Sequence, residues 1–370
     1  MDPLLLAIQL LLVVLLAPLV QGLIKTSKAR WQNRRGPGIL QPYFDLLKWL
    51  GRESVVSDQA SWVFRVAPFV YAGAIIVAAA LVPTFAAGSA APGFGDAIVF
   101  VGLFALARFW LALAALDTGS NFGGMGSSRE VAFAALIEPA LLLVVFAVAL
   151  PGGSTSLTAL VGSGWPGASD AAAFVGLMIV AIAETGRIPV DNPDTHLELT
   201  MVHEGMLLEY SGRPLGVLHW TTQIKQLAIL SLIAALFLPW GMADPARLGL
   251  ASVLIGVGVW ALKVCGLGLL LGVVETAFAK LRIFRVPDLV GAASVSAGYR
   301  RHGDIRGRAV AMNDLISTGQ AGTLINAMAL GLLALGLVSV LVKHLETAIV
   351  LLAGQGLLGA AGAAAATDMA

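Results

Sequence analysis

Long apolar runs separated by polar loops dominate the pattern of this chain. The runs are about 20 residues long, which suits an α-helix that crosses a bilayer and is about twice the length of a membrane barrel strand. We therefore predict an all-α integral membrane protein with about eight transmembrane helices in a single domain over residues 1–370. The predicted spans are residues 3–24, 66–86, 96–116, 130–150, 170–188, 224–243, 249–275 and 322–342.

The last apolar segment, residues 347–366, is rich in alanine and interrupted by four glycines. It could form a ninth span, but we interpret it as a terminal appendage to the predicted domain. No internal repeat at a fixed period is visible, which is unlike many secondary transporters.

The composition agrees with a membrane protein. Hydrophobic residues make up 58% of the 370 residues and charged residues only 12%, whereas soluble domains carry about 25% charged residues. The single cysteine, Cys265, lies in an apolar run and cannot by itself form an internal disulfide or hold an iron–sulfur cluster. We therefore expect this chain to bind no redox centre of its own, and the net charge of +1 gives no reason to expect nucleic acid.

The distribution of positive charge predicts the orientation of the chain. With eight spans, the loops 25–65, 117–130, 185–225 and 276–320 share one side and hold 19 of the 23 lysines and arginines. Two fall on the other side, and two lie within spans. Because cytoplasmic loops are enriched in lysine and arginine, we predict an external N-terminus and large cytoplasmic polar loops.

A short amphipathic helix is predicted within the first cytoplasmic loop, at residues 41–50. Its pattern places Phe44 and Leu47 on one face, and Asp45 and Lys48 on the other. The helix could lie at the membrane surface, or it could pack on protein.

Ionisable residues are concentrated in the stretch Glu184–Gly212, between two spans. Asp194 or Thr195 could cap a helix through His196–Tyr210. The stretch contains six carboxylates and two histidines: Glu184, Asp191, Asp194, Glu198, Glu204, Glu209, His196 and His203. Their spacing matches no standard metal site, so we expect none, and the admixed methionines and leucines indicate that the loop packs on something.

Several ionisable residues fall inside or at the ends of predicted spans, where a charge costs roughly 2.5–3.5 kcal/mol unless it is paired or hydrated. Glu138 is the clearest, because apolar residues surround it and Pro139 removes a backbone donor. A proton path is one interpretation, and an ion pair with Arg108 that only holds helices together is the other. The candidates are Arg108, Asp117, Glu138, Glu184, Lys263 and Glu275.

Ordered motifs along the whole chain resemble subunit 1 of respiratory complex I, and more closely the homologous membrane subunit of formate hydrogenlyase and hydrogenase-4 type nickel–iron hydrogenases. Gly186 and Val190 stand where complex I usually has Asn and Phe, which points to the hydrogenase branch. The motifs are Arg34-Arg35-Gly36-Pro37, Arg129 with Glu138 nine residues later, Glu184-Thr185-Gly186-Arg187-Ile188-Pro189-Val190-Asp191, Glu209-Tyr210-Ser211-Gly212 and Arg282-Ile283-Phe284-Arg285-Val286-Pro287-Asp288.

The resemblance implies a multi-pass subunit of the bacterial or archaeal cytoplasmic membrane that docks a peripheral redox arm and couples electron transfer to proton or sodium movement. It implies antiporter-like membrane partners, and cytoplasmic iron–sulfur and hydrogenase-like partners that carry the iron–sulfur clusters and any nickel–iron site. The implied coupling path is Glu138, Glu184, Asp191, Asp194, Glu198, Glu204 and Glu209. The implied docking or charge partners are Arg34, Arg35, Arg108, Arg129, Arg187, Lys263, Arg282 and Arg285, with His196, His203 and Tyr210 as further loop residues.

Three alternatives remain open from the sequence. The chain could be the quinone-site subunit of a true NADH:quinone oxidoreductase, with a quinone bound near residues 25–65 and 184–213. It could be a free-standing ion transporter, which the absence of repeats disfavours. It could also be a purely structural anchor.

Overall fold

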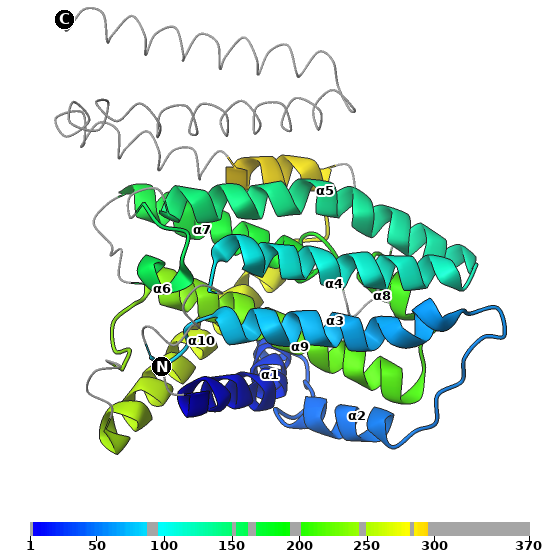
Figure 1. Cartoon of the computed structure of the whole chain (residues 1–370), viewed down its shortest axis with the longest axis horizontal. Helices are drawn as coiled ribbons and strands as arrows, with labels where there is room; N and C mark the ends of the chain where they lie inside the picture. The colour runs from blue at the N-terminus through cyan, green and yellow to red at the C-terminus, as the bar shows by residue number, and fades with distance from the viewer. Residues whose placement is uncertain are drawn as a thin grey trace, which may run out of the picture. The chain divides into compact units, whose positions relative to one another are not determined.

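The computed structural model describes residues 3–86, 95–149, 153–161, 168–192, 201–243, 249–281 and 285–294 (Figure 1). By contacts the chain divides into two units, Met1–Asp304 and Ile305–Ala370. All of the described residues belong to the first unit. The predicted span 322–342 and the segment 347–366 lie outside the described residues.

Helices account for all regular structure in the described ranges, and only two isolated β-bridges occur there. Six helices are long and apolar enough to cross a membrane, and α7 contains a shorter apolar segment. The long helices are α1 (Pro3–Trp31), α3 (Trp62–Leu81), α4 (Ala97–Asp117), α5 (Asn121–Ala149), α7 (Ala168–Glu184), α9 (Gly212–Phe237) and α10 (Leu250–Ala277). The short ones are α2 (Gln41–Leu50), α6 (Leu157–Leu160) and α8 (His203–Leu207). The chain is thus an all-α multi-pass membrane protein, and each predicted span within the described ranges corresponds to a helix.

Three helices extend by seven or more residues beyond the predicted spans. Helix α1 continues beyond residue 24 to Trp31, α5 begins at Asn121 instead of 130, and α9 begins at Gly212 instead of 224. These added turns contain polar side chains, which hydropathy assigns to loops. They are helical because they pack on protein: α9 contacts α2, and α5 contacts α8.

Helix α9 lies at the centre of the first unit. It packs against α1, α2, α3, α7 and α10, and it is the most buried of the six candidate spans. Figure 1 shows α3, α4 and α5 running side by side, in agreement with their contacts. Because neighbours surround α9, its buried polar residues (Thr221, Lys225, Gln226 and Ser231) face protein and not lipid.

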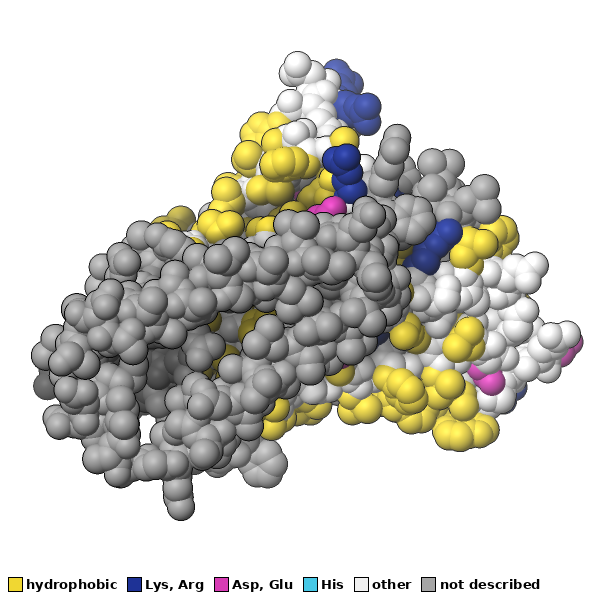
Figure 2. All heavy atoms as spheres, turned by 90° about the horizontal axis from the view of Figure 1, so that it is seen from above, with side chains coloured by type: hydrophobic (Ala, Val, Ile, Leu, Met, Phe, Trp, Pro, Cys, Tyr) yellow, Lys and Arg dark blue, Asp and Glu magenta, His cyan; other side chains and the backbone are white. Residues whose placement is uncertain are grey.

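The outer faces of the peripheral helices carry many large apolar side chains. Examples are Phe69, Phe109 and Leu262, which are all exposed. Figure 2 shows broad hydrophobic areas on one face, with basic side chains gathered in one part of it. Such apolar exposure is expected of a protein surrounded by lipid and membrane partners.

The predicted short helix is confirmed as α2, with the same bounds. Leu46 is buried, whereas Phe44 and Leu47 are exposed. The Tyr43 hydroxyl donates to the Leu15 carbonyl oxygen at 2.5 Å, and Trp49 stacks on His219 with ring centroids 4.5 Å apart. Helix α2 therefore packs on α1 and α9 with one face and turns an apolar face outward.

Candidate functional site: a buried charge network

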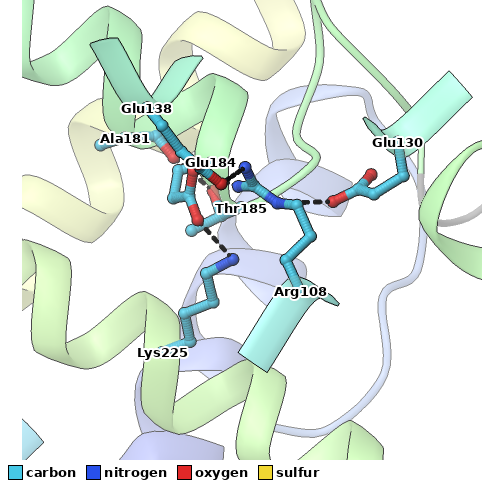
Figure 3. A network of polar contacts seen from close by, with 7 residues as sticks. All are labelled: Arg108, Glu130, Glu138, Ala181, Glu184, Thr185 and Lys225. Atoms are coloured by element: carbon cyan, nitrogen blue, oxygen red, sulfur yellow. Dashed lines mark hydrogen bonds and ion pairs between the residues drawn. The ribbon is translucent and has the colours of Figure 1, made fainter. Parts of the chain in front are cut away.

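The guanidinium of Arg108, on α4, contacts three carboxylates. Its Nη1 donates to Glu138 Oε1 at 2.9 Å, and its Nη2 donates to Glu184 Oε2. Its Nε lies 3.2 Å from Glu130 Oε1. These two groups form an ion pair without a hydrogen bond. Figure 3 shows the acids converging on Arg108 from α5 and α7. The Arg108–Glu138 pair expected from the sequence is present, as part of a larger cluster.

A second cation completes this cluster from the central helix. Lys225 Nζ, on α9, lies 2.7 Å from Glu184 Oε1 (Figure 3), and 5.2 Å from the centroid of the Phe104 ring. The side chains of Arg108, Glu184 and Lys225 are all at most 6% exposed. We call Arg108, Glu130, Glu138, Glu184 and Lys225 the Arg108 cluster. It has three carboxylates and two cations, so full ionisation would give these five residues a net charge of −1.

A second buried group surrounds Arg187, three residues after Glu184. Arg187 Nη1 donates to Glu275 Oε1 at 3.0 Å, and Nη2 contacts Gln226 Oε1 at 2.5 Å and Gln21 Oε1. Lys28 Nζ lies 3.0 Å from Glu275 Oε2. These five residues form the Arg187 cluster. It joins α1, α9 and α10 to the turn that follows α7.

The two clusters are adjacent because members of each are close neighbours in the sequence, in the turn after α7 and on α9. Glu184 and Arg187 flank a tight turn in which Gly186 has a φ of +58°, a conformation that glycine adopts without steric cost. Lys225 and Gln226 are consecutive residues of α9. The polar groups therefore form a nearly continuous band through the apolar core, from α5 to α10.

Asp191 extends the band toward the loop. Its Oδ1 accepts a hydrogen bond from Lys280 Nζ at 2.7 Å, and its Oδ2 accepts one from the backbone N–H of Val202 at 3.3 Å. Asp191 is buried. It thus fixes both the turn after α7 and the chain entering α8.

The loop after Asp191 differs from the predicted helix over His196–Tyr210. Of the described residues, only His203–Leu207 are α-helical. Met201 and Val202 precede the helix because their backbone groups are held from outside: Arg129 Nη1 donates to the Met201 carbonyl oxygen at 3.0 Å, and Asp191 binds the Val202 N–H. Three predicted site residues, Asp194, His196 and Glu198, lie outside the described residues.

The segment Tyr210–Gly212 anchors another loop. The Tyr210 hydroxyl donates to the Phe64 carbonyl oxygen at 3.0 Å, and the two rings stack with centroids 4.0 Å apart. Ser211 Oγ bonds both the N–H and the carbonyl oxygen of Val55. Burial, followed by the nearby charge of Asp117, raises the pKa of Tyr210. The Tyr210 hydroxyl therefore stays neutral near pH 7 and anchors this segment to α3.

Two further predicted residues have evident structural contacts. Lys263 Nζ donates to the carbonyl oxygens of Leu238, at 2.5 Å, and Trp240, so it satisfies the C-terminus of α9. Asp117 accepts a hydrogen bond from the Ser61 N–H at 2.7 Å, where α3 begins. Neither residue belongs to the two clusters.

The other predicted residues lie nearer the surface. Arg34, Arg35 and Arg285 are exposed, and Glu204 and Glu209 are half-buried in α8 and just after it. Arg282 lies outside the described residues. In the described ranges, no group of three histidine, cysteine, aspartate or glutamate side chains has the geometry to hold a metal ion.

Sequence reasoning missed several members of the clusters. Glu130 is the first residue of the predicted span 130–150, but α5 begins nine residues earlier and Glu130 pairs with Arg108. Lys225 and Gln226 fell at a predicted loop boundary. One signal was available in the sequence. Thr221 and Lys225 are four residues apart, a spacing that places both on one face of a helix and could have indicated a buried polar stripe.

The comparisons with known proteins agree with this architecture. The family model described as NADH dehydrogenase matches residues 4–296. The chain is 37% identical over 290 residues to formate hydrogenlyase subunit 4 of Escherichia coli (strain K12), covering 77% of this chain and 93% of the relative. It is 36% identical over 282 residues to hydrogenase-4 component C of the same organism, covering 75% and 88%.

More distant similarity extends to respiratory complexes. The chain is 28% identical over 216 residues to NADH-quinone oxidoreductase subunit 8 of Rhodothermus marinus, covering 55% of this chain and 62% of the relative. A chain in the structure of the membrane-bound sulfane sulfur reductase, an archaeal respiratory membrane complex, has the same fold, with a TM-score of 0.67 at 22% identity. That match covers 80% of this chain and 99% of the other.

Proposed function

Because this chain belongs to the NADH dehydrogenase family and is a membrane subunit of a complex I-related complex, we propose that its buried charge network couples electron transfer in partner subunits to ion movement. The single observation that carries this proposal is the excess carboxylate in the Arg108 cluster. Three carboxylates and two cations in a nonpolar surrounding favour holding one exchangeable proton.

Exposure within the cluster indicates where that proton exchanges. The Glu138 side chain is 29% exposed, compared with 15% for Glu130 and 1% for Glu184. Glu138 lies on α5, at the outer side of the cluster. A proton held on Glu138 would be within reach of a neighbouring membrane subunit. Glu184, in contrast, is buried and pairs with both cations, Arg108 and Lys225.

The hydrogenase-type branch is the better fit for the partners. Two relatives at 37% and 36% identity are named as subunits of formate hydrogenlyase and hydrogenase-4, whereas the NADH-quinone oxidoreductase relatives considered are 27–31% identical. The proposed partners are antiporter-like membrane subunits and cytoplasmic iron–sulfur and hydrogenase-like subunits. The proposed location is the bacterial or archaeal cytoplasmic membrane.

Purification of the tagged chain in a gentle detergent, followed by mass spectrometry, tests the partners. Hydrogenase-like and antiporter-like subunits in the preparation would support the proposal. NADH-oxidising subunits would replace it with the quinone-site function. A monodisperse chain purified alone would favour a free-standing transporter.

Coupling is tested in vesicles that contain the whole complex. Electron transfer from the donor of the purified complex is measured together with pH-dye quenching and uptake of radioactive sodium. In Glu138→Gln and Glu184→Gln, we expect ions moved per electron to fall roughly tenfold or more. Glu53→Gln, which changes an exposed carboxylate outside both clusters, is the control. Full ion movement in both cluster variants would leave only a structural anchor.

A further inference from the structure

His203 is a buried titratable residue that belongs to neither cluster. It is the first residue of α8, and its Nε2 atom is inaccessible to solvent and has no hydrogen-bond partner among the described residues. Buried polar atoms are usually bonded, so an unpaired ring nitrogen calls for a functional explanation. The residue as a whole is half-buried, and its Nε2 atom lies on the buried side.

Close packing fixes the position of His203 against α5. A Cβ atom added at Gly126 would lie 3.0 Å from the Val202 carbonyl oxygen and 3.2 Å from Gly205 Cα, so only glycine allows this approach without displacement. Arg129 holds the preceding Met201 carbonyl oxygen from the same helix. The start of α8 is therefore immobilised beside the turn of α5 that carries Glu130.

The turn after α7 holds His203 from the other side. Asp191 binds the N–H of Val202 at 3.3 Å, and a Cβ added at Gly186 would lie 3.8 Å from the Cβ of His203. The start of α8 thus contacts both the Asp191 side chain and α5, the helix that carries Glu130.

Charged groups from every adjoining element act on the imidazole. Burial is the largest influence and lowers the pKa of His203; Glu130 of α5 and Asp191 raise it, whereas Lys225 of α9 and Arg108 of α4 lower it. His219 of α9 is also electrostatically coupled to His203. The resting imidazole is therefore neutral near pH 7, so one ring nitrogen can accept a proton and the other can donate one.

We propose that His203 relays protons between Asp191 at the loop and Glu130 of the Arg108 cluster. In each transfer, one ring nitrogen takes a proton from a carboxyl group, directly or through one water, and the other ring nitrogen releases its proton to the opposite carboxylate. The ring returns to its starting state after reorientation, and no electrons move. This inference rests on the proposed coupling function. It makes His203 the residue through which protons reach the Arg108 cluster.

Chemical rescue in vesicles of the whole complex tests the relay. In His203→Ala, we expect proton movement per electron to fall roughly tenfold or more, and added imidazole to restore much of it because it can occupy the vacated space. A purely structural role would not be restored by a diffusible base. The control is His219→Phe, which retains a ring to stack on Trp49 and should gain nothing from imidazole.

The isosteric variant His203→Gln provides an independent readout if the alanine variant does not assemble. We expect its proton movement to be low at every pH, without the dependence on a titrating imidazole that the wild type should show below the ordinary histidine pKa of about 6.5. Full coupling in His203→Gln, or a loss in His203→Ala that imidazole does not restore, would overturn the relay. If Glu138→Gln and Glu184→Gln lower coupling while His203→Gln does not, only the relay fails. If all three retain coupling, the proposed function fails as well.

Discussion

At the scale of single residues, Arg108 shows why this membrane protein tolerates so many charges in its core. One planar guanidinium neutralises carboxylates from two helices at once, and Lys225 shares Glu184 with it. Arginine suits this position because its fork of donors addresses several acceptors in fixed directions. All three carboxylates therefore depend on Arg108 for part or all of their charge compensation within the cluster.

Replacement of Arg108 tests this dependence. Arg108→Gln leaves Glu184 and Glu138 with fewer partners, and we expect a destabilisation of about 3–5 kcal/mol, the usual cost of breaking a buried ion pair. Arg108→Lys should recover only part of it, because one ammonium group cannot address three carboxylates. Thermal unfolding of the purified complex measures both effects. Arg52→Gln, at an exposed side chain outside both clusters, should cost about 0.5 kcal/mol or less, and an equal loss at both positions would contradict this ranking.

The lowered pKa of His203 also predicts a pH dependence of stability. Below the unfolded-state pKa of about 6.5, the unfolded chain binds a proton that the folded imidazole resists, so stability falls as pH decreases. His203→Gln removes this contribution. We expect the difference in unfolding temperature between about pH 7.5 and pH 5.5 to be smaller in this variant than in the wild type, and an unchanged difference would indicate an ordinary histidine.

At the scale of elements, the segment that begins α9 contacts the loop over residues 51–61 and the start of α3. Tyr210 and Ser211 hold Phe64 and Val55, and Gly212 has a φ of +55° with its α-carbon against the loop. An added Cβ at Gly212 would lie 2.3 Å from the Glu53 carbonyl oxygen. The segment therefore has a structural role, because it holds the loop over residues 51–61 against the start of α9, the central helix.

Gly212→Ala should loosen this fastening. Both the left-handed backbone and the contact with Glu53 oppose a side chain, and we expect a cost of about 1–3 kcal/mol with faster hydrogen exchange in residues 51–61. Gly73→Ala is the matched control because nothing lies within 4 Å of its added Cβ inside α3. That variant should be stabilised slightly, by about 0.5–1 kcal/mol. Equal exchange in the two variants would exclude the fastening.

At the scale of the whole molecule, exposed basic side chains follow α1 on the face that we predict to be cytoplasmic. Arg34 and Arg35 are both exposed, and they do not belong to either buried cluster. They are available to a peripheral partner, whereas the apolar outer faces of the helices suit lipid and membrane partners.

A charge reversal tests that docking role. In Arg34→Glu/Arg35→Glu, we expect the peripheral subunits to dissociate at lower salt than in the wild type, with a loss of roughly twofold to tenfold in affinity, as exposed ion pairs contribute about 0.2–1 kcal/mol each. Co-purification across a series of salt concentrations measures the effect. Arg247→Glu, on the opposite predicted side, should behave as the wild type, and the same dissociation in both variants would contradict the predicted sides.

The sequence by itself determined the membrane class, a helix at each of the seven predicted spans within the described ranges, and the bounds of α2. These depend on local properties: apolar runs of sufficient length and amphipathic spacing need no knowledge of neighbours. The same local reading placed the starts of α5 and α9 too late, since polar turns that pack on protein have the hydropathy of loops.

Only the tertiary structure decided which charges meet. Arg108 and Glu184 are 76 residues apart, and Arg187 and Glu275 are 88 apart, so their pairing depends on the rotation and depth of several packed helices. A hydropathy pattern contains neither quantity. For the same reason, Glu130 and Lys225 looked like unremarkable end residues in the sequence but lie in the core of the Arg108 cluster. His203, predicted only as a loop residue, begins a helix that packs closely on α5 because Gly126 and Gly205 allow the approach.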